Sequence, residues 1–248
     1  MRTVIVLFSV LSILALVLSA CAYFSESEEC RDPRCLDEQR LQLQEFHTLY
    51  TKEQTYSGAP GEGNSESSVE VWEKGEKARY HFKPAQGEEL VGVDFAGNIL
   101  FCLGQNDSFY CENVPFEDDF FIVSDFTTPY LLPLFPKAKD PAAIKGLPPD
   151  EFDFFMTART RLFDNLVYAG KRMQLGEESL CFALKEGHDL PNTLSLDICY
   201  HSNGIMTSYT AEILEDGRQR RDYIELKTFE TTVDDDVFTL PGTIDTTD

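Results

Sequence analysis

The residues of this chain best suited to covalent chemistry are its seven cysteines. Cys21 stands apart, directly after an apolar run at the N-terminus. The other six form three pairs that are close in sequence: Cys30 with Cys35, Cys102 with Cys111, and Cys181 with Cys199. A thiol can be alkylated, oxidised to a disulfide or used as a metal ligand. The odd number therefore poses two questions, the chemical fate of Cys21 and the pairing of the other six.

The fate of Cys21 is indicated by the segment before it. Arg2 supplies a positive charge, residues 4–18 are almost wholly apolar, and small residues precede the cysteine, as in a signal peptide. The sequence Leu-Ser-Ala-Cys that ends at Cys21 resembles the signal of bacterial lipoproteins, in which the thiol takes a diacylglycerol and the freed amine is often acylated. We therefore predict a lipoprotein signal peptide over residues 1–20 and acyl chains such as palmitate on Cys21. A plain secretory signal and an uncleaved N-terminal anchor are the alternatives.

The pairing of Cys102 with Cys111 follows from counting along a predicted hairpin. A turn centred on residues 106–107 pairs Gln105 with Ser108 and, three steps further, Cys102 with Cys111. If the first pair is hydrogen-bonded, the cysteines form a non-hydrogen-bonded pair with Cα atoms about 4.5 Å apart, which a disulfide can bridge. An exported protein meets an oxidising compartment, so disulfides are expected. The predicted disulfides are Cys30–Cys35, Cys102–Cys111 and Cys181–Cys199.

Catalytic and cofactor-binding motifs are absent from the sequence. It contains no P-loop, no nucleophile elbow and no zinc-protease motif. The four histidines are far apart in sequence: His47, His81, His188 and His201. None has enough neighbouring ligands for zinc, and the aspartates at 118–119 and 234–236 lack the alternation of a calcium loop. We therefore expect no cofactor, no metal site and no enzymatic activity.

The composition indicates an acidic exported protein. Removal of residues 1–20 leaves 228 residues (248 − 20), which suits one large β domain. A net charge of −22 excludes the basic surface that nucleic acid requires. The same charge argues against a basic patch that binds anionic lipid. Because the acidic residues are spread along the chain, we interpret them as a solvated, self-repelling surface.

The elements that must position these residues are mostly β-strands. Residues 33–45 show helical spacing with acidic residues early, and short β-rich segments separated by Gly, Asn or Asp turns follow. About ten antiparallel strands are predicted from eleven β-rich segments: residues 48–57, 69–72, 77–82, 89–95, 99–103, 108–114, 165–173, 178–184, 193–201, 205–214 and 222–230.

Residues 116–155 interrupt this series of strands. The segment combines repeated prolines with many apolar residues, which excludes central strands and a solvated linker. A long connection of this kind is often a lid, so we predict short helices that cover the β structure. Its aromatic side chains either fill a core or line an apolar cavity. The candidate cavity and lid residues are Phe120, Phe121, Phe126, Tyr130, Leu134 and Phe135.

Three segments resemble a known family. Residues 69–80, a strand–turn–strand that ends in Arg and Tyr, residues 97–101 (Gly-Asn-Ile-Leu-Phe) and residues 234–241 (Asp-Asp-Asp-Val-Phe-Thr-Leu-Pro) resemble parts of the LolA/LolB-like lipoprotein carriers and the RseB/MucB-type envelope-stress sensors. The resemblance implies a mainly β (α+β) fold: an incomplete antiparallel barrel of about ten strands, with an N-terminal helix and a central helical lid over a cavity for acyl chains. The predicted domains are a signal peptide (1–20), a tether (21–35), a single LolA-like β domain (36–242) with the lid at 116–155, and a polar tail (243–248).

These patterns predict a lipid-anchored extracytoplasmic protein of the cell envelope that binds an apolar ligand or a lipoprotein acyl chain in a half-open barrel. Its disulfides and its own lipid signal favour an anchored binder over a shuttling carrier. The alternative is an envelope sensor or protein-interaction module with a filled core, whose acidic surface and Gly/Ser-rich loop at 58–68 meet a protein partner. A hydrolase is the weakest alternative. The expected partners are the membrane, through the anchor, and a lipid, lipoprotein or protein.

Overall fold

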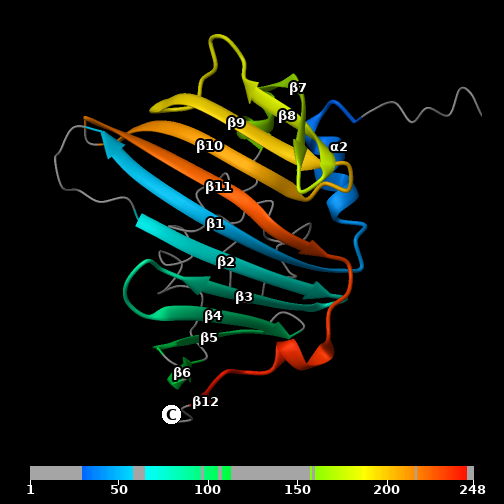
Figure 1. Ribbon diagram of the computed structural model, residues 1–248, viewed down its shortest axis with the longest axis vertical. Helices are drawn as coiled ribbons and strands as arrows, with labels where there is room; N and C mark the ends of the chain where they lie inside the picture. The colour runs from blue at the N-terminus through cyan, green and yellow to red at the C-terminus, as the bar shows by residue number, and fades with distance from the viewer. Residues whose placement is uncertain are drawn as a thin grey trace, which may run out of the picture. The chain divides into compact units, whose positions relative to one another are not determined.

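A computed structural model of the chain describes residues 30–57, 65–95, 98–105, 108–112, 157, 160–215 and 217–244. The strands among them form one 12-stranded sheet in the order β12-β6-β5-β4-β3-β2-β1-β11-β10-β9-β8-β7 (Figure 1). Strand β12 runs parallel to β6, and all other neighbours are antiparallel. The sheet is therefore open, with β12 and β7 at its two edges. This open antiparallel sheet confirms the predicted incomplete barrel.

The bounds of the elements follow the predicted series closely. They are α2 (Pro33–Arg40), β1 (Glu45–Ser57), β2 (Ser65–Lys74), β3 (Lys77–Lys83), β4 (Glu89–Phe95), β5 (Asn98–Gln105), β6 (Ser108–Glu112), β7 (Leu166–Gln174), β8 (Glu177–Leu184), β9 (Thr193–His201), β10 (Met206–Glu215), β11 (Arg218–Glu230), η3 (Asp235–Phe238) and β12 (Thr243–Ile244). Among the described residues, no helix is long and apolar enough to cross a membrane.

Helix α2 is shorter than the sequence predicts. It begins after Asp32, whose carboxylate accepts a hydrogen bond from the Arg34 N–H, the usual role of an N-cap aspartate. It ends at Arg40 instead of residue 45, and β1 begins at Glu45. The predicted end is wrong because burial beyond the helix alternates as in a strand, with Phe46, Thr48 and Tyr50 buried and the residues between them half-buried.

The disulfides lie where strand register places them. Cys102 is the register partner of Cys111, with Gln105 opposite Ser108 as counted from the sequence, and a disulfide joins the two cysteines, whose Cα atoms are 3.9 Å apart. The register of β8 and β9 likewise places Cys181 opposite Cys199, and a disulfide joins them. Cys30 and Cys35 are both disulfide-bonded, and their bond to each other stays a prediction.

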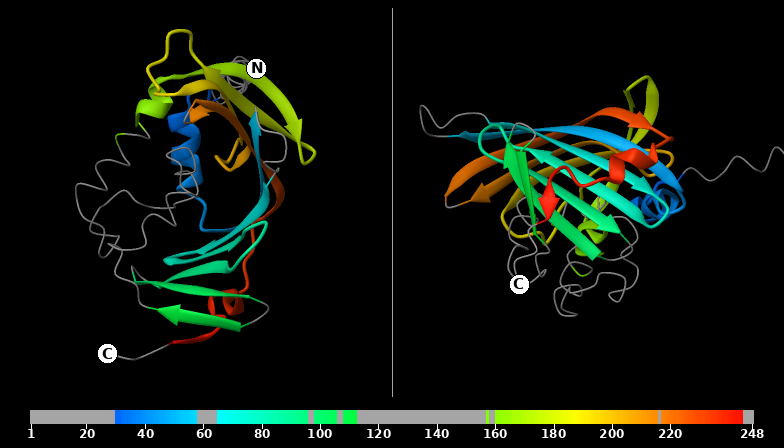
Figure 2. Two further views of the ribbon diagram at one scale, coloured as in Figure 1. Left: turned by 90° about the vertical axis from the view of Figure 1, so that its left-hand side faces the viewer. Right: turned by 90° about the horizontal axis from the view of Figure 1, so that it is seen from below.

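The two faces of the sheet have different coverings. Figure 2 shows that the sheet is strongly curved and that α2 lies on its concave side. The convex side of β3–β6 is crossed by residues 233–244, which we call the C-terminal strap. Arg79 of β3 holds the strap by donating to the carbonyl oxygens of Val237 at 2.5 Å and Thr239 at 3.0 Å.

Beneath the strap lies a small apolar core. Val91, Val93 and the Cys102–Cys111 disulfide are fully buried there, and Leu240 of the strap packs against them. Because the strap covers the convex side, this half of the sheet buries apolar side chains on both faces. The concave face remains as the surface on which a site could be built.

Candidate functional site

The concave face carries a continuous row of large apolar side chains. Strand register aligns Phe182 with Ile198, Ile198 with Tyr209, and Tyr209 with Ile224. All four are buried, with at most 3% of each side chain exposed. Burial of side chains of this size contributes about 1.5–3 kcal/mol each. The row is therefore an apolar wall that runs across β8, β9, β10 and β11.

A buried charged cluster lies on the same face beside α2. The Arg40 guanidinium lies 3.9 Å from a carboxylate oxygen of Asp37 and 3.9 Å from one of Glu73, on β2. Arg40 is 3% exposed, Glu73 5% and Asp37 8%. Charged groups are rarely buried to this extent unless they are paired. The cluster therefore holds the end of α2 against the middle of the sheet.

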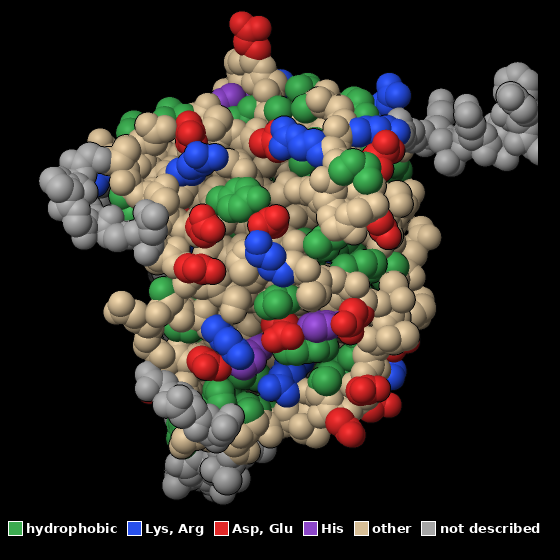
Figure 3. All heavy atoms as spheres, viewed as in Figure 1, with side chains coloured by type: hydrophobic (Ala, Val, Ile, Leu, Met, Phe, Trp, Pro, Cys, Tyr) green, Lys and Arg blue, Asp and Glu red, His purple; other side chains and the backbone are tan. Residues whose placement is uncertain are grey.

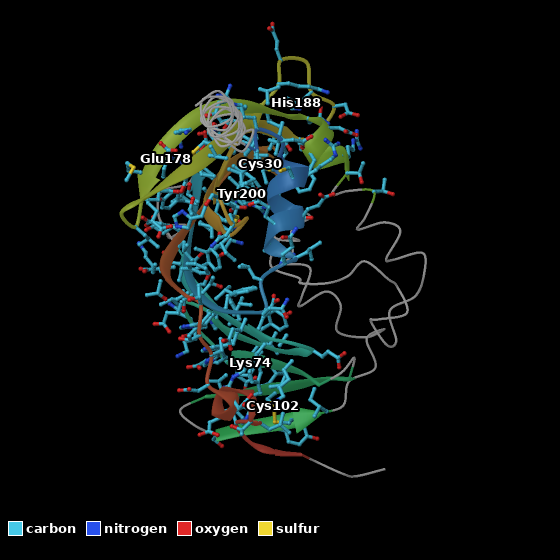
Figure 4. The ribbon with its side chains drawn as sticks, turned by 90° about the vertical axis from the view of Figure 1, so that its right-hand side faces the viewer. Cys30, Lys74, Cys102, Glu178, His188 and Tyr200 are labelled. Atoms are coloured by element: carbon cyan, nitrogen blue, oxygen red, sulfur yellow. A yellow bond between two sulfur atoms is a disulfide. The ribbon has the colours of Figure 1, made fainter. Side chains whose placement is uncertain are left out.

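Tyrosine hydroxyls surround the cluster. Tyr50, Tyr80 and Tyr200 lie close enough to Arg40 to influence its ionisation, and Figure 4 shows Tyr200 near α2. Burial lowers the pKa of Arg40, and Glu73 is the strongest group that opposes this shift. Burial raises the pKa of the Tyr50 phenol well above its usual value, so this hydroxyl stays neutral. The cluster thus offers hydrogen-bonding groups inside an apolar wall, without a nucleophile and base in contact.

A second charged group lies on the concave face near the start of β11. Arg220 is 3.2 Å from Asp222, which is 2% exposed, and 2.8 Å from Glu215. Burial alone would lower the pKa of Arg220, but Asp222 and Glu215 outweigh it and the pKa is raised. Asp222 is two residues from Ile224 along β11, so this charged group lies beside the β11 end of the apolar row.

Two of the histidines are bound to carboxylates on the convex face. His47 lies 2.9 Å from Glu70 and stacks on Trp72 with ring centroids 5.0 Å apart. His81 lies 2.7 Å from Glu89. Figure 3 shows histidine and acidic side chains side by side on this face. Across the part of the chain that the structure describes, no group of three or more His, Cys, Asp or Glu side chains could hold a metal ion.

His201 contacts a serine, which raises the question of nucleophilic chemistry. Its Nδ1 lies 3.3 Å from the Ser179 hydroxyl and 3.9 Å from a Glu177 oxygen. A catalytic triad uses the two ring nitrogens for different partners, whereas here the serine and the carboxylate approach the same nitrogen. Ser179 is 0% exposed and also accepts a hydrogen bond from Thr207. We interpret the group as a satisfied polar contact of the core.

A polar pocket lies at the start of β7. Its volume is about 700 Å³, and it is lined by Thr157, Thr160, Arg161, Asp164, Asn165, Lys185, Gly187 and Asp189. Within it, Arg161 lies 3.3 Å from Asp189, and Lys185 donates to the Asp164 carbonyl. Hydrogen bonds from Asn165 and Arg161 lower the pKa of Asp189. These contacts fasten the loop between β8 and β9 to the start of β7.

Most of the predicted site residues cannot be placed. The predicted signal peptide, Cys21 and the lid at 116–155 lie outside the described residues. So do its candidate residues Phe120, Phe121, Phe126, Tyr130, Leu134 and Phe135. The sequence reasoning missed the charged cluster, because it assigned Glu73 to a turn, whereas β2 continues to Lys74. One signal was present: Glu73 follows Val69 and Val71 at strand spacing, on the side that becomes buried.

Comparison with known proteins finds similar folds among solved structures. No family model and no curated protein matches the sequence. The MucA/MucB complex of Pseudomonas aeruginosa is similar in structure, with 14% identity, a TM-score of 0.42, and coverage of 84% of this chain and 59% of that chain. The Mycobacterium tuberculosis lipoprotein LppX has 10% identity and a TM-score of 0.38, with 82% and 98% covered. A LolA-superfamily protein from Nitrosomonas europaea has 8% identity and a TM-score of 0.31, with 84% and 98% covered. At these identities the likeness concerns the fold alone.

Proposed function

We propose that this protein is a non-catalytic binding protein of the cell envelope, anchored through lipid on Cys21, that holds an apolar ligand on the concave face of its sheet. The ligand class is a lipid or the acyl chain of a lipoprotein. The observation that carries the proposal is the apolar row of Phe182, Ile198, Tyr209 and Ile224, with charged groups at Arg40 and Arg220 on the same face.

The physical argument rests on the length and chemistry of this row. Each CH₂ group that moves from water onto such a wall gains about 0.8 kcal/mol, so an acyl chain can bind without any directed contact. The polar end of the same ligand requires hydrogen bonds, because an unpaired buried polar group is costly. The cluster at Arg40 supplies a guanidinium and phenol hydroxyls next to the wall. An apolar wall with polar groups on the same face therefore suits an amphipathic ligand.

The first test is native mass spectrometry of residues 21–248 carrying Cys21→Ser, produced in an oxidising compartment and purified gently. We expect a co-purifying mass of lipid size that is released on denaturation. Ile198→Thr, on the apolar row, should lower lipid occupancy severalfold. Leu194→Thr, on the same strand but at a side chain that is 52% exposed, should leave occupancy unchanged. A protein without bound lipid in every preparation would refute the ligand.

The anchor is tested separately in cells. Full-length protein should yield an N-terminal peptide whose mass includes acyl chains on Cys21, and Cys21→Ser should abolish them. An unmodified N-terminus in the wild-type protein would contradict the anchor and leave the ligand proposal standing.

A second candidate function is an envelope sensor or protein-interaction module with a filled core. The observation that favours it is the burial of the concave row within the chain itself, since none of its four members is more than 3% exposed. In this case native mass spectrometry gives bare protein, and chemical crosslinking in membranes should recover one specific protein partner. Bound lipid in the same experiment would contradict this candidate.

A further inference from the structure

The turn between β7 and β8 breaks a local backbone rule. Gln174 pairs with Glu177, so the turn has two central residues, Leu175 with φ 51° and Gly176 with φ 82°. Positive φ at both positions defines a type I′ turn, which favours Asn, Asp or Gly at the first of them. Leucine in the left-handed region is strained by its Cβ. Elsewhere in the described chain the only non-glycine residue with positive φ is Asn192, a residue type that tolerates it.

The same turn exposes its apolar side chains. Leu175 is 52% exposed and Met173, at the end of β7, is 68% exposed. Strand β7 is an edge of the sheet, and Figure 4 places Glu178, just after the turn, at the margin of the molecule. Asparagine at position 175 would relieve both the strain and the exposure. A strained and exposed residue of this kind is a candidate for function.

We propose that Met173 and Leu175, here called the apolar tip, dock on the lipid bilayer to which the chain is tethered. This inference rests on the proposed anchor at Cys21. From Cys21 to Pro33, the first residue of α2, there are 12 residues (33 − 21), which span at most about 40 Å. An ion pair between Arg34 and Asp164 ties α2 to the start of β7. The nine residues of β7 then rise about 30 Å to the tip. This distance is shorter than the extended tether, so the tip lies within reach of the bilayer that holds the anchor.

The charges around the tip permit this approach. A chain with a net charge of −22 is repelled by anionic lipid as a whole. At the tip, however, Lys171 lies 2.7 Å from Glu178, and Arg172 lies 2.6 Å from Asp197. Glu178 and Asp197 thus have basic partners, and Glu177, beside the tip, lies 3.9 Å from the His201 ring, so these five side chains carry a net charge of only −1 (two basic, three acidic). Two apolar side chains bind a bilayer only weakly, so the tip acts as a second contact that orients a protein already held by its tether.

The test uses residues 21–248 with the native disulfides, which leave Cys21 as the only free thiol. Cys21 is coupled to a maleimide lipid in phosphatidylcholine vesicles, and dilute peroxide is added to tethered and to free protein. Mass spectrometry then follows conversion of Met173 to its sulfoxide. We expect Met173 to oxidise at least threefold more slowly on the vesicles. A methionine introduced by Leu214→Met, at a side chain 43% exposed on the β10–β11 hairpin, should oxidise at equal rates in both forms.

Leu175→Asn makes the test specific to the tip. The variant should lose most of the protection of Met173 while its melting temperature stays equal or rises. Equal oxidation of Met173 on and off vesicles would overturn the proposal, and so would protection that persists in Leu175→Asn. Protection that requires an added envelope protein would assign the tip to a protein partner and also overturn it. Because the tether is attached chemically, the result does not depend on lipidation in cells or on a ligand in the concave face.

Discussion

Replacement of Arg40 by methionine should destabilise the fold far more than the same change at an exposed arginine. The guanidinium lies 3.9 Å from each of two carboxylates, on Asp37 and Glu73. At an effective dielectric constant of about 20, one such pair corresponds to about 4 kcal/mol of attraction, most of which offsets the cost of burying the charges. Arg40→Met removes the attraction and leaves two carboxylates without their cation. The expected loss in the free energy of unfolding is therefore about 3–5 kcal/mol.

The assay is urea unfolding followed by the fluorescence of Trp72, the single tryptophan, which directly precedes Glu73. The matched control is Arg172→Met. Arg172 pairs with Asp197 at 2.6 Å but is 54% exposed, so its loss should cost less than about 1 kcal/mol. Adding Glu73→Leu to Arg40→Met should recover part of the stability, because a buried carboxylate is removed. A loss at Arg40 no greater than the loss at Arg172 would refute the claim that the cluster is buried and paired.

Three further predictions test other parts of the structure. Burial lowers the pKa of His81 below its usual value of 6.5, against the opposing effect of Glu89, so the unfolded chain binds the proton more tightly. The free energy of unfolding should therefore fall as the pH drops below about 6.5, and His81→Gln should reduce the slope in urea titrations at pH 5–7. A Cβ at Gly204, where φ is +84°, would lie 1.9 Å from the Leu36 carbonyl oxygen, whereas one at Gly217, where φ is +78°, meets nothing within 4 Å. Gly204→Ala should thus cost several kcal/mol and Gly217→Ala about 1 kcal/mol, and equal melting temperatures would contradict the packing of α2 on the β9–β10 turn. Leu175→Asn should stabilise the fold by about 1 kcal/mol, which calorimetry would detect as a higher melting temperature.

The sequence alone was sufficient for features that depend on neighbours in the chain. Turn chemistry and strand patterning predicted nearly every hairpin, and counting from the turn at 106–107 predicted the register that joins Cys102 to Cys111. Such features are accessible because a hairpin forms between adjacent segments and its turn sets the register.

Only the tertiary structure decided which residues from distant segments meet. It ended α2 at Arg40 and brought Glu73 of β2 to it, a contact between segments that are far apart in the sequence. It laid the strap over β3, where Arg79 donates to the carbonyl oxygens of Val237 and Thr239. It also left Leu175 exposed in a strained turn at a sheet edge. The sequence predicts only that this position belongs to a turn. Curvature of the open sheet determines which side of each strand is enclosed, and that curvature arises from all twelve strands together. A pattern of period two in one strand predicts that one side is buried, but it does not predict which charged residues that burial will bring into contact.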